Sequence, residues 1–306
     1  MLILIAGITG ALGQRLANVA ISRGISVRGL GRNPDSLSTE LSSQLESFIK
    51  STSYYDVPAL EKAVSGVDAV INAYAPTPVL DLDGHLLLLR AAERAGIKIF
   101  IASSWSRDWT NLKFGDFEHY NNHIAFEHQI ATTSPIRPVY LFTGLFADLL
   151  YTPYGPGGFD TGGEKPRMKY WGDDGKTNKW PWSTQADAAE YTIDILLYGK
   201  GVQAGEGGFF RVRSGTTTVE ELAAVYEKVY GIAVDVTREG SVEDLEAELA
   251  RLRKERGRAR YIEYMWEAAA VVASKGLWEN SDITILDQFR KPTSLEEHFG
   301  GEKNKG

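Results

Sequence analysis

Short apolar runs alternate with helical patterns from the first residues of the chain. Leu2 to Ala6 is a continuous apolar stretch, typical of a parallel strand that is covered on both faces. From Gln14 to Arg23 the apolar residues recur at helical spacing, and Gly24 follows directly. Residues 25–30 then have the pattern of a second strand. The first thirty residues therefore predict a strand, a turn, a helix and a strand.

The alternation continues to about residue 143, and helical patterns dominate the second half. It predicts an α/β fold with a doubly wound parallel sheet of the Rossmann type. Residues 300–306 (GGEKNKG) have the composition of a frayed tail. Further strands are predicted at 47–51, 68–73, 97–102, 138–143 and 209–212, and helices at 58–64, 85–95, 119–132, 219–230 and 242–260.

Three glycines lie where the first strand becomes the first helix, in the segment GITGALG at 7–13. Glycine allows a tight turn and lets a pyrophosphate approach the N–H groups at the helix N-terminus. The spacing is G-x-x-G-x-x-G rather than G-x-G-x-x-G, and a turn without a nucleotide is the alternative. We expect a dinucleotide here, held by Gly7, Thr9, Gly10, Ala11, Leu12 and Gly13.

The end of the second strand bears on the choice of dinucleotide. NAD-binding chains commonly place an acidic residue there to bind the ribose hydroxyls. Here the strand ends in RGLGRNP, with no acid at its tip. Arg32 offers a planar guanidinium that suits a 2′-phosphate, although it could also be a solvated loop residue. We expect NADP(H).

Polar residues follow the fourth and fifth predicted strands, at 72–76 (NAYAP) and 103–106 (SSWS). In a parallel α/β sheet, ligands bind at the carboxyl ends of the strands. Turn and capping chemistry is an equal alternative for the serines. We predict cofactor contacts at Asn72, Ala73, Tyr74 and Ser103, a supporting catalytic role for Ser104, and substrate contact at Trp105.

The connected segments GITGALGQRL, VRGLGRNPDSL, VSGVDAVINAYAP and AAERAGIKIFIASSW resemble the NmrA-like and isoflavone-reductase-like branch of the atypical short-chain dehydrogenases. The later segments SPIRPVYLFTGLFADLL, WPWSTQADAAEYTIDILL and TTTVEELAAVYEKVYG continue this resemblance. It implies a Rossmann fold and NADP(H). It further implies an NADPH-dependent reductase in plant members, a dinucleotide-sensing regulator in the namesake, and redox-neutral steps in some fungal members.

One departure from the plant reductases concerns the catalytic residue. In the plant reductases that this chain resembles, a lysine stands two residues before an Ala-Phe-Glu sequence. In this chain the corresponding residue, within NHIAFE, is His123. The Y-x-x-x-K pair of ordinary short-chain dehydrogenases is also absent. On one helix, Tyr120, His123 and Glu127 would share a face, and Glu127 would favour a protonated imidazole. We predict His123 as general acid with Tyr120 in support; a polar helix residue is the alternative. We expect no metal site.

The second half begins with a glycine- and proline-rich aromatic segment, YTPYGPGGF, that leads to WPW at 180–182. Aromatic side chains on such a loop suit a planar aromatic substrate, although each could instead fill a core. The predicted substrate contacts are Phe146, Tyr151, Tyr154, Trp180 and Trp182. We expect a Rossmann domain over 1–149, rejoined by 185–213, and a smaller α+β substrate domain over 150–306.

Composition excludes several classes of protein. The 306 residues carry a formal net charge of −7, so no overall positive field attracts nucleic acid or an anionic membrane. The absence of cysteine excludes disulfides, thiol nucleophiles and thiolate ligands. No apolar run approaches the ~20 residues of a membrane span. We expect a cytoplasmic protein that binds a small molecule. The sequence leaves open whether the chain forms a homo-oligomer.

Three functions remain from the sequence. The leading one is an NADPH-dependent oxidoreductase that transfers hydride to a small aromatic or polycyclic metabolite, as in secondary metabolism. The first alternative is a redox-neutral enzyme of natural-product biosynthesis (cyclisation, rearrangement or condensation) that retains NADP(H), which the missing lysine favours. The second is an NmrA-like dinucleotide-sensing regulator.

Overall fold

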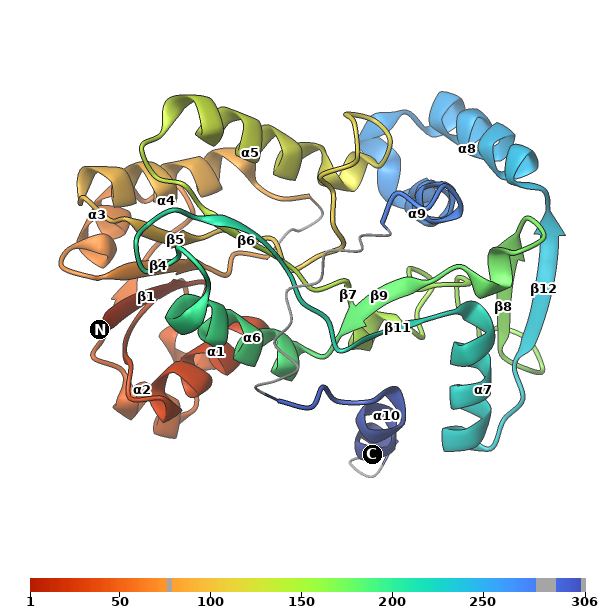
Figure 1. Ribbon diagram of the computed structural model, residues 1–306, viewed down its shortest axis with the longest axis horizontal. Helices are drawn as coiled ribbons and strands as arrows, with labels where there is room; N and C mark the ends of the chain where they lie inside the picture. The colour runs from red at the N-terminus through yellow and green to blue at the C-terminus, as the bar shows by residue number, and fades with distance from the viewer. Residues whose placement is uncertain (76–78, 279–289, 304–306) are drawn as a thin grey trace. The chain divides into compact units, whose positions relative to one another are not determined.

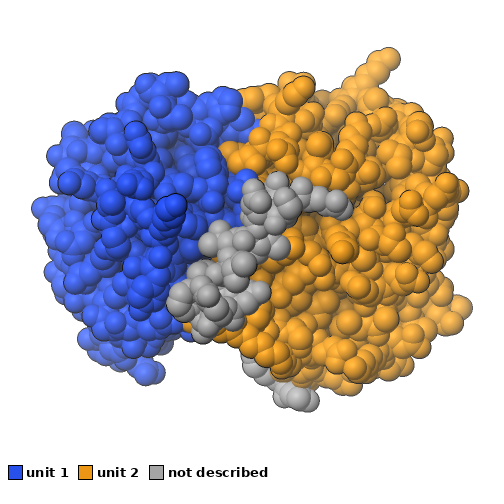
Figure 2. Space-filling view, in the orientation of Figure 1, with its two compact units in different colours: residues 1–105, 122–142, 188–211 blue, residues 106–121, 143–187, 212–306 orange. Residues whose placement is uncertain are grey.

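The computed structural model describes residues 1–75, 79–278 and 290–303, and the chain divides into two compact units (Figure 2). Unit 1 consists of Met1–Trp105, Asn122–Phe142 and Ala188–Arg211. Unit 2 consists of Ser106–Asn121, Thr143–Asp187 and Val212–Gly306. The assignment of one domain to the cofactor and one to the substrate stays a prediction.

Unit 1 is built on a seven-stranded parallel sheet with strand order β10-β6-β5-β4-β1-β2-β3. The order reverses between β1 and β4, which is the topological switch point where α/β sheets bind ligands. The predicted doubly wound Rossmann-type sheet is confirmed. Its strands are β1 (Leu2–Ala6), β2 (Ser26–Gly31), β3 (Ser47–Lys50), β4 (Ala69–Asn72), β5 (Ile99–Ile101), β6 (Val139–Phe142) and β10 (Gly208–Arg211).

Helices cover both faces of this sheet, with α3, α4 and α5 on one face and α1, α2 and α6 on the other (Figure 1). The strands between them are buried on both sides, which is why β1 and the first three residues of β4 are continuous apolar runs. The helices are α1 (Ala11–Ser22), α2 (Thr39–Gln44), α3 (Val57–Val64), α4 (Leu82–Arg94), α5 (Asn121–Thr133) and α6 (Gln185–Tyr198).

Unit 2 has two small sheets and four α-helices within its described residues. One sheet has the order β11-β9-β7, and the other pairs β12 with β8. The strands are β7 (Leu145–Phe146), β8 (Arg167–Trp171), β9 (Trp180–Ser183), β11 (Gly215–Thr217) and β12 (Asp235–Gly240). The helices are α7 (Val219–Tyr230), α8 (Val242–Arg256), α9 (Met265–Ser274) and α10 (Leu295–Lys303).

Several predicted helix boundaries are wrong, such as the start of α4 at Leu82 rather than at residue 85. Two others have local reasons. The helix expected over 242–260 ends at Arg256, because Gly257 has a φ of +69° that an α-helix does not contain. A 3-10 segment, Arg258–Tyr264, follows it. The helix expected from residue 119 starts as α-helix at Asn121, after a separate 3-10 turn at Glu118–Tyr120.

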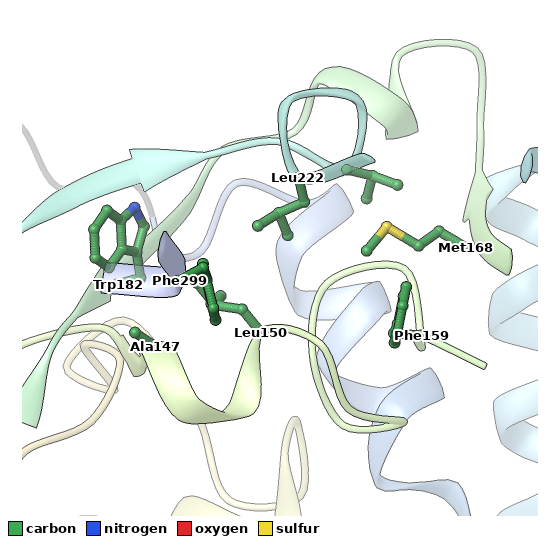
Figure 3. Close-up of a cluster of buried hydrophobic side chains, with 8 residues drawn as sticks. Ala147, Leu150, Phe159, Met168, Trp182, Leu222 and Phe299 are labelled. Carbon is green, nitrogen blue, oxygen red and sulfur yellow. The ribbon is translucent and has the colours of Figure 1, made fainter. Parts of the chain in front are cut away.

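The predicted tail is partly helical. α10 extends to Lys303, and residues 304–306 lie outside the described residues. Ser294 and Glu297 cap the start of α10 reciprocally, since each side chain accepts a hydrogen bond from the other residue's backbone N–H. Phe299 anchors the helix in the core of unit 2 (Figure 3). Its buried neighbours there are Ala147, Leu150, Phe159, Met168, Trp182, Val219 and Leu222.

Within the described residues, the helices are too short or too polar to cross a lipid bilayer.

Candidate functional site

The turn between β1 and α1 is packed so closely that two of its glycines cannot be replaced. Gly7 has a φ of +82°, and a Cβ there would lie 2.6 Å from the carbonyl oxygen of Ala73. A Cβ on Gly13 would lie 2.3 Å from the carbonyl oxygen of Gly7. These glycines therefore bring α1 against β1 and the end of β4, which is the structural role that such glycines have in dinucleotide-binding turns.

Gly10 has a different environment. It is exposed, has an ordinary φ of −78°, and a Cβ there would meet only the carbonyl oxygen of Gly7, at 3.4 Å. Gly10 is the N-cap residue of α1 and, as a glycine, has no side chain to cap the helix. The N–H groups of the first turn, at Ala11 and Leu12, are therefore available to an anion, and the helix dipole favours one.

Arg32 follows β2 and is exposed. Its guanidinium carbon lies 5.6 Å from the centre of the Tyr54 ring, and Tyr54 stacks on Tyr74 with ring centres 4.3 Å apart. No hydrogen bond or ion pair engages Arg32 in the part of the chain that the structure describes. Thr9 packs beside this strand, since a Cβ on Gly31 would lie 2.9 Å from its methyl carbon. Arg32 is thus a cation held beside an aromatic ring, with its donors open to a phosphate.

The loop after β4 is held by buried polar groups. Asn72 Oδ1 accepts a hydrogen bond from the backbone N–H of Tyr74 at 3.2 Å, so its amide nitrogen faces His85 Nδ1 at 2.9 Å. Ser103 Oγ donates to the carbonyl of Tyr74 at 2.7 Å. Ala73 lies between these contacts, and Pro76 lies outside the described residues. Asn72, Tyr74 and Ser103 therefore form one hydrogen-bonded group at the ends of β4 and β5.

His85 is the residue of this group that the sequence analysis did not single out. Burial lowers its pKa to about 4, with a smaller opposing effect from the Asp81 carboxylate. The imidazole is therefore neutral near pH 7. Since Asn72 donates to Nδ1, the proton of the neutral ring is on Nε2, which has no hydrogen-bond partner within the described residues. The only sequence signal was its position at the start of the helix after β4.

Ser104 is fully buried and belongs to the sheet. Its hydroxyl donates to the carbonyl of Ala102 at 3.2 Å and accepts from the backbone N–H of Leu141 at 2.8 Å. These bonds join the ends of β5 and β6. Trp105 is half-buried, and its indole N–H donates to Thr192 at 2.8 Å.

His123 lies in α5 and is 5% exposed. Its predicted acidic partner lies beside another histidine: Glu127 Oε2 is 3.6 Å from Nε2 of the exposed His128. Tyr120 lies outside α5, in the preceding 3-10 turn, and its hydroxyl accepts the backbone N–H of Arg107 at 3.1 Å. A general-acid role for His123 therefore cannot be derived from a pairing with Glu127.

The six predicted substrate residues fall into different environments. Tyr151 packs against Phe159, Tyr226 and Phe299 and donates its hydroxyl to the carbonyl of Leu222. Trp182 belongs to the core cluster of unit 2 (Figure 3). Phe146 and Trp105 are half-buried, Tyr154 is 43% exposed and Trp180 is 4% exposed. Tyr151 and Trp182 thus have structural contacts that explain them without a ligand.

A small cavity in unit 2 is lined by Trp171, Trp180, Trp266 and Lys169. Its volume of about 20 Å³ is enough for a water molecule and far below that of an aromatic substrate. The described residues contain no group of three or more His, Asp or Glu side chains arranged to hold a metal ion.

A family model for NmrA-like proteins matches residues 1–299. The chain belongs to the NmrA-like family. Comparison with curated protein sequences gives no significant match.

Three solved structures illustrate the likeness of this NmrA-like protein to known folds. AtPrR2 with NADP+ and (+)pinoresinol has 19% identity and a TM-score of 0.75, with 97% of each chain covered. Leucoanthocyanidin reductase with NADPH from Vitis vinifera has 18% identity and a TM-score of 0.73, covering 98% of this chain and 99% of that one. NADPH-dependent quinone oxidoreductase QOR2 with NADPH from Escherichia coli has 21% identity and a TM-score of 0.72, covering 99% and 100%. At these identities the likeness concerns the fold.

Proposed function

We propose that this protein is an NADPH-dependent oxidoreductase that reduces a small aromatic metabolite. The observation that carries the proposal is the exposed, uncapped start of α1 at Gly10, together with the open guanidinium of Arg32 after β2. The helix start suits the pyrophosphate and Arg32 suits a 2′-phosphate. The similar structures with NADP+ or NADPH and with reductase names support the same cofactor and reaction class here.

The residues around this site fit NADPH in separate roles. Gly7 and Gly13 set the turn, Gly10 leaves room for the phosphates, and Arg32 holds the 2′-phosphate. Asn72 and Ser103 fix the loop after β4, at the switch point of the sheet. When bound, NADPH supplies a hydride from its nicotinamide. The protein holds the substrate and supplies a proton, for which His123 is our candidate donor. Tyr120, whose hydroxyl accepts the backbone N–H of Arg107, is our candidate supporting residue.

The alternative is a redox-neutral reaction with retained NADP(H). One observation favours it: a buried histidine, His123, occupies the position where the plant reductases carry a lysine. An imidazole can both give and take a proton near neutral pH, whereas a lysine is usually protonated there.

Oxidation of NADPH tests the proposal. We would incubate the purified protein with NADPH and a panel that contains a quinone, pinoresinol and an aromatic enone, and follow the absorbance of reduced nicotinamide. We expect substrate-dependent loss of this absorbance, and none with Gly10→Val. Product formation without any loss of absorbance would instead support the redox-neutral alternative, and NADPH that does not bind would refute both.

A further inference from the structure

Unit 2 contains a buried arginine without an anionic partner among the described residues. Arg107 is 6% exposed, and none of the ion pairs in this part of the chain involves it. Its Nη1 atom is buried and has no hydrogen-bond partner there. Its Nε lies 3.5 Å from the hydroxyl of Tyr120, which is a weak, uncharged contact. A buried charge normally requires a counter-charge or several hydrogen bonds.

Aromatic rings surround the guanidinium of Arg107. Its central carbon lies 4.0 Å from the centre of the Trp278 ring and 5.5 Å from the centres of the Phe117 and Trp180 rings. Trp278 contacts both of the other rings, with centres 5.9 Å from Phe117 and 5.4 Å from Trp180. These rings stabilise the cation but accept no strong hydrogen bond. The N–H donors of Nη1 therefore have no acceptor among the described residues.

Two acidic residues could be expected to pair with Arg107, but both have other partners. One follows it in sequence, and the other lies on the same 3-10 turn as Tyr120. Asp108 accepts two hydrogen bonds from Thr110, at 2.6 and 2.8 Å. Glu118 pairs with Arg253 at 2.8 Å. His119 is neutral, because burial and the nearby Arg107 charge lower its pKa to about 4. No group on these elements thus neutralises Arg107.

We propose that Arg107 binds the carboxylate of a planar aromatic ligand within unit 2. A guanidinium presents paired donors that match a carboxylate, and the surrounding rings favour a flat aromatic body beside it. The inference goes beyond the proposed function, because it assigns a ligand site within unit 2. It adds a residue that the sequence analysis did not single out, and it predicts that uncharged aromatic molecules are weaker ligands than aromatic acids.

A matched pair of probes tests this inference. We would titrate 2-naphthoate and 2-naphthamide into the full-length protein by calorimetry, with NADPH titrated in a separate experiment. The wild-type protein should bind naphthoate about 10- to 100-fold more tightly than naphthamide, as expected for a charge-assisted contact. Arg107→Gln should remove this preference and Arg107→Lys should keep part of it. Arg238→Gln, which removes an exposed positive charge in the same unit, should leave it unchanged.

Two outcomes would overturn the inference: equal affinity of the wild-type protein for the two probes, or an unchanged preference in a folded Arg107→Gln variant. If Arg107→Gln does not fold, the wild-type comparison decides alone. The NADPH titration separates this inference from the proposed function. A protein that binds NADPH without preferring naphthoate contradicts only the inference, whereas one that prefers naphthoate without binding NADPH contradicts only the proposed cofactor.

Discussion

Asn72 donates a hydrogen bond to Nδ1 of His85 over 2.9 Å, within the buried part of unit 1. The same asparagine accepts the backbone N–H of Tyr74, so one side chain fixes both the loop after β4 and the tautomer of a buried histidine. The arrangement requires a neutral imidazole, since a protonated Nδ1 could not accept this hydrogen bond. We therefore expect protonation of His85 to break this hydrogen bond.

The first prediction concerns this dependence. The unfolded chain protonates His85 near pH 6.5, and the folded chain only near pH 4. Stability from the neutral imidazole is therefore fully present above about pH 6.5 and is lost as the pH falls towards 4, by up to about 1.4 kcal/mol per pH unit. His85→Gln should weaken this fall in the free energy of unfolding, measured by urea denaturation. His128→Gln, which replaces a side chain that is 73% exposed, should leave the fall in the free energy of unfolding unchanged. Parallel pH profiles for His85→Gln and wild type would contradict the assignment.

The second prediction concerns His123. If it is the proton donor, His123→Ala should lose about 10²- to 10⁴-fold in turnover, with the affinity for NADPH nearly unchanged. His123→Lys restores the residue of the plant reductases and should keep part of a reductase activity, whereas a redox-neutral reaction should fail with lysine. Glu127→Gln is the matched control and should retain turnover, because Glu127 lies beside His128. Wild-type turnover from both His123 variants would leave His123 as an ordinary buried residue.

The third prediction separates two glycines of the turn. Gly10→Val should abolish NADPH binding in a folded protein, because its side chain would point into open space that the phosphates need. Gly13→Val should destabilise the protein itself, by at least the ~1–3 kcal/mol of an overpacked core, because its Cβ would meet the carbonyl oxygen of Gly7. Thermal unfolding and calorimetric titration of both variants distinguish these effects. Tight NADPH binding by Gly10→Val would place the phosphates elsewhere.

Features set by local sequence were predicted well. The apolar run at Leu2–Ala6, the glycines of the turn and the periodicity of α1 are each specified within a few residues, and the parallel sheet follows from their repetition. The start of α10 is also specified locally, since Ser294 and Glu297 have the spacing of a capping box.

Contacts between distant segments could not be predicted. Hydrophobic periodicity does not distinguish an aromatic residue of a core from one of a binding site, and Tyr151 and Trp182 proved to have core contacts. The environment of Arg107 is formed with Trp180 and Trp278, which are far from it in sequence. His85 likewise acquires its role only when α4 places it against Asn72.

The central claim is that Arg32 and the glycine turn hold NADPH, and calorimetric titration tests it most directly. Wild-type protein should bind NADPH more tightly than NADH. Arg32→Ala should reduce NADPH affinity about 10- to 100-fold, as for loss of a charge-assisted contact, and should leave NADH affinity nearly unchanged. Arg15→Ala, which removes an exposed arginine of α1, is the control and should keep the preference for NADPH. Equal affinity of the wild-type protein for NADPH and NADH, or an unaltered preference in Arg32→Ala, would contradict the account.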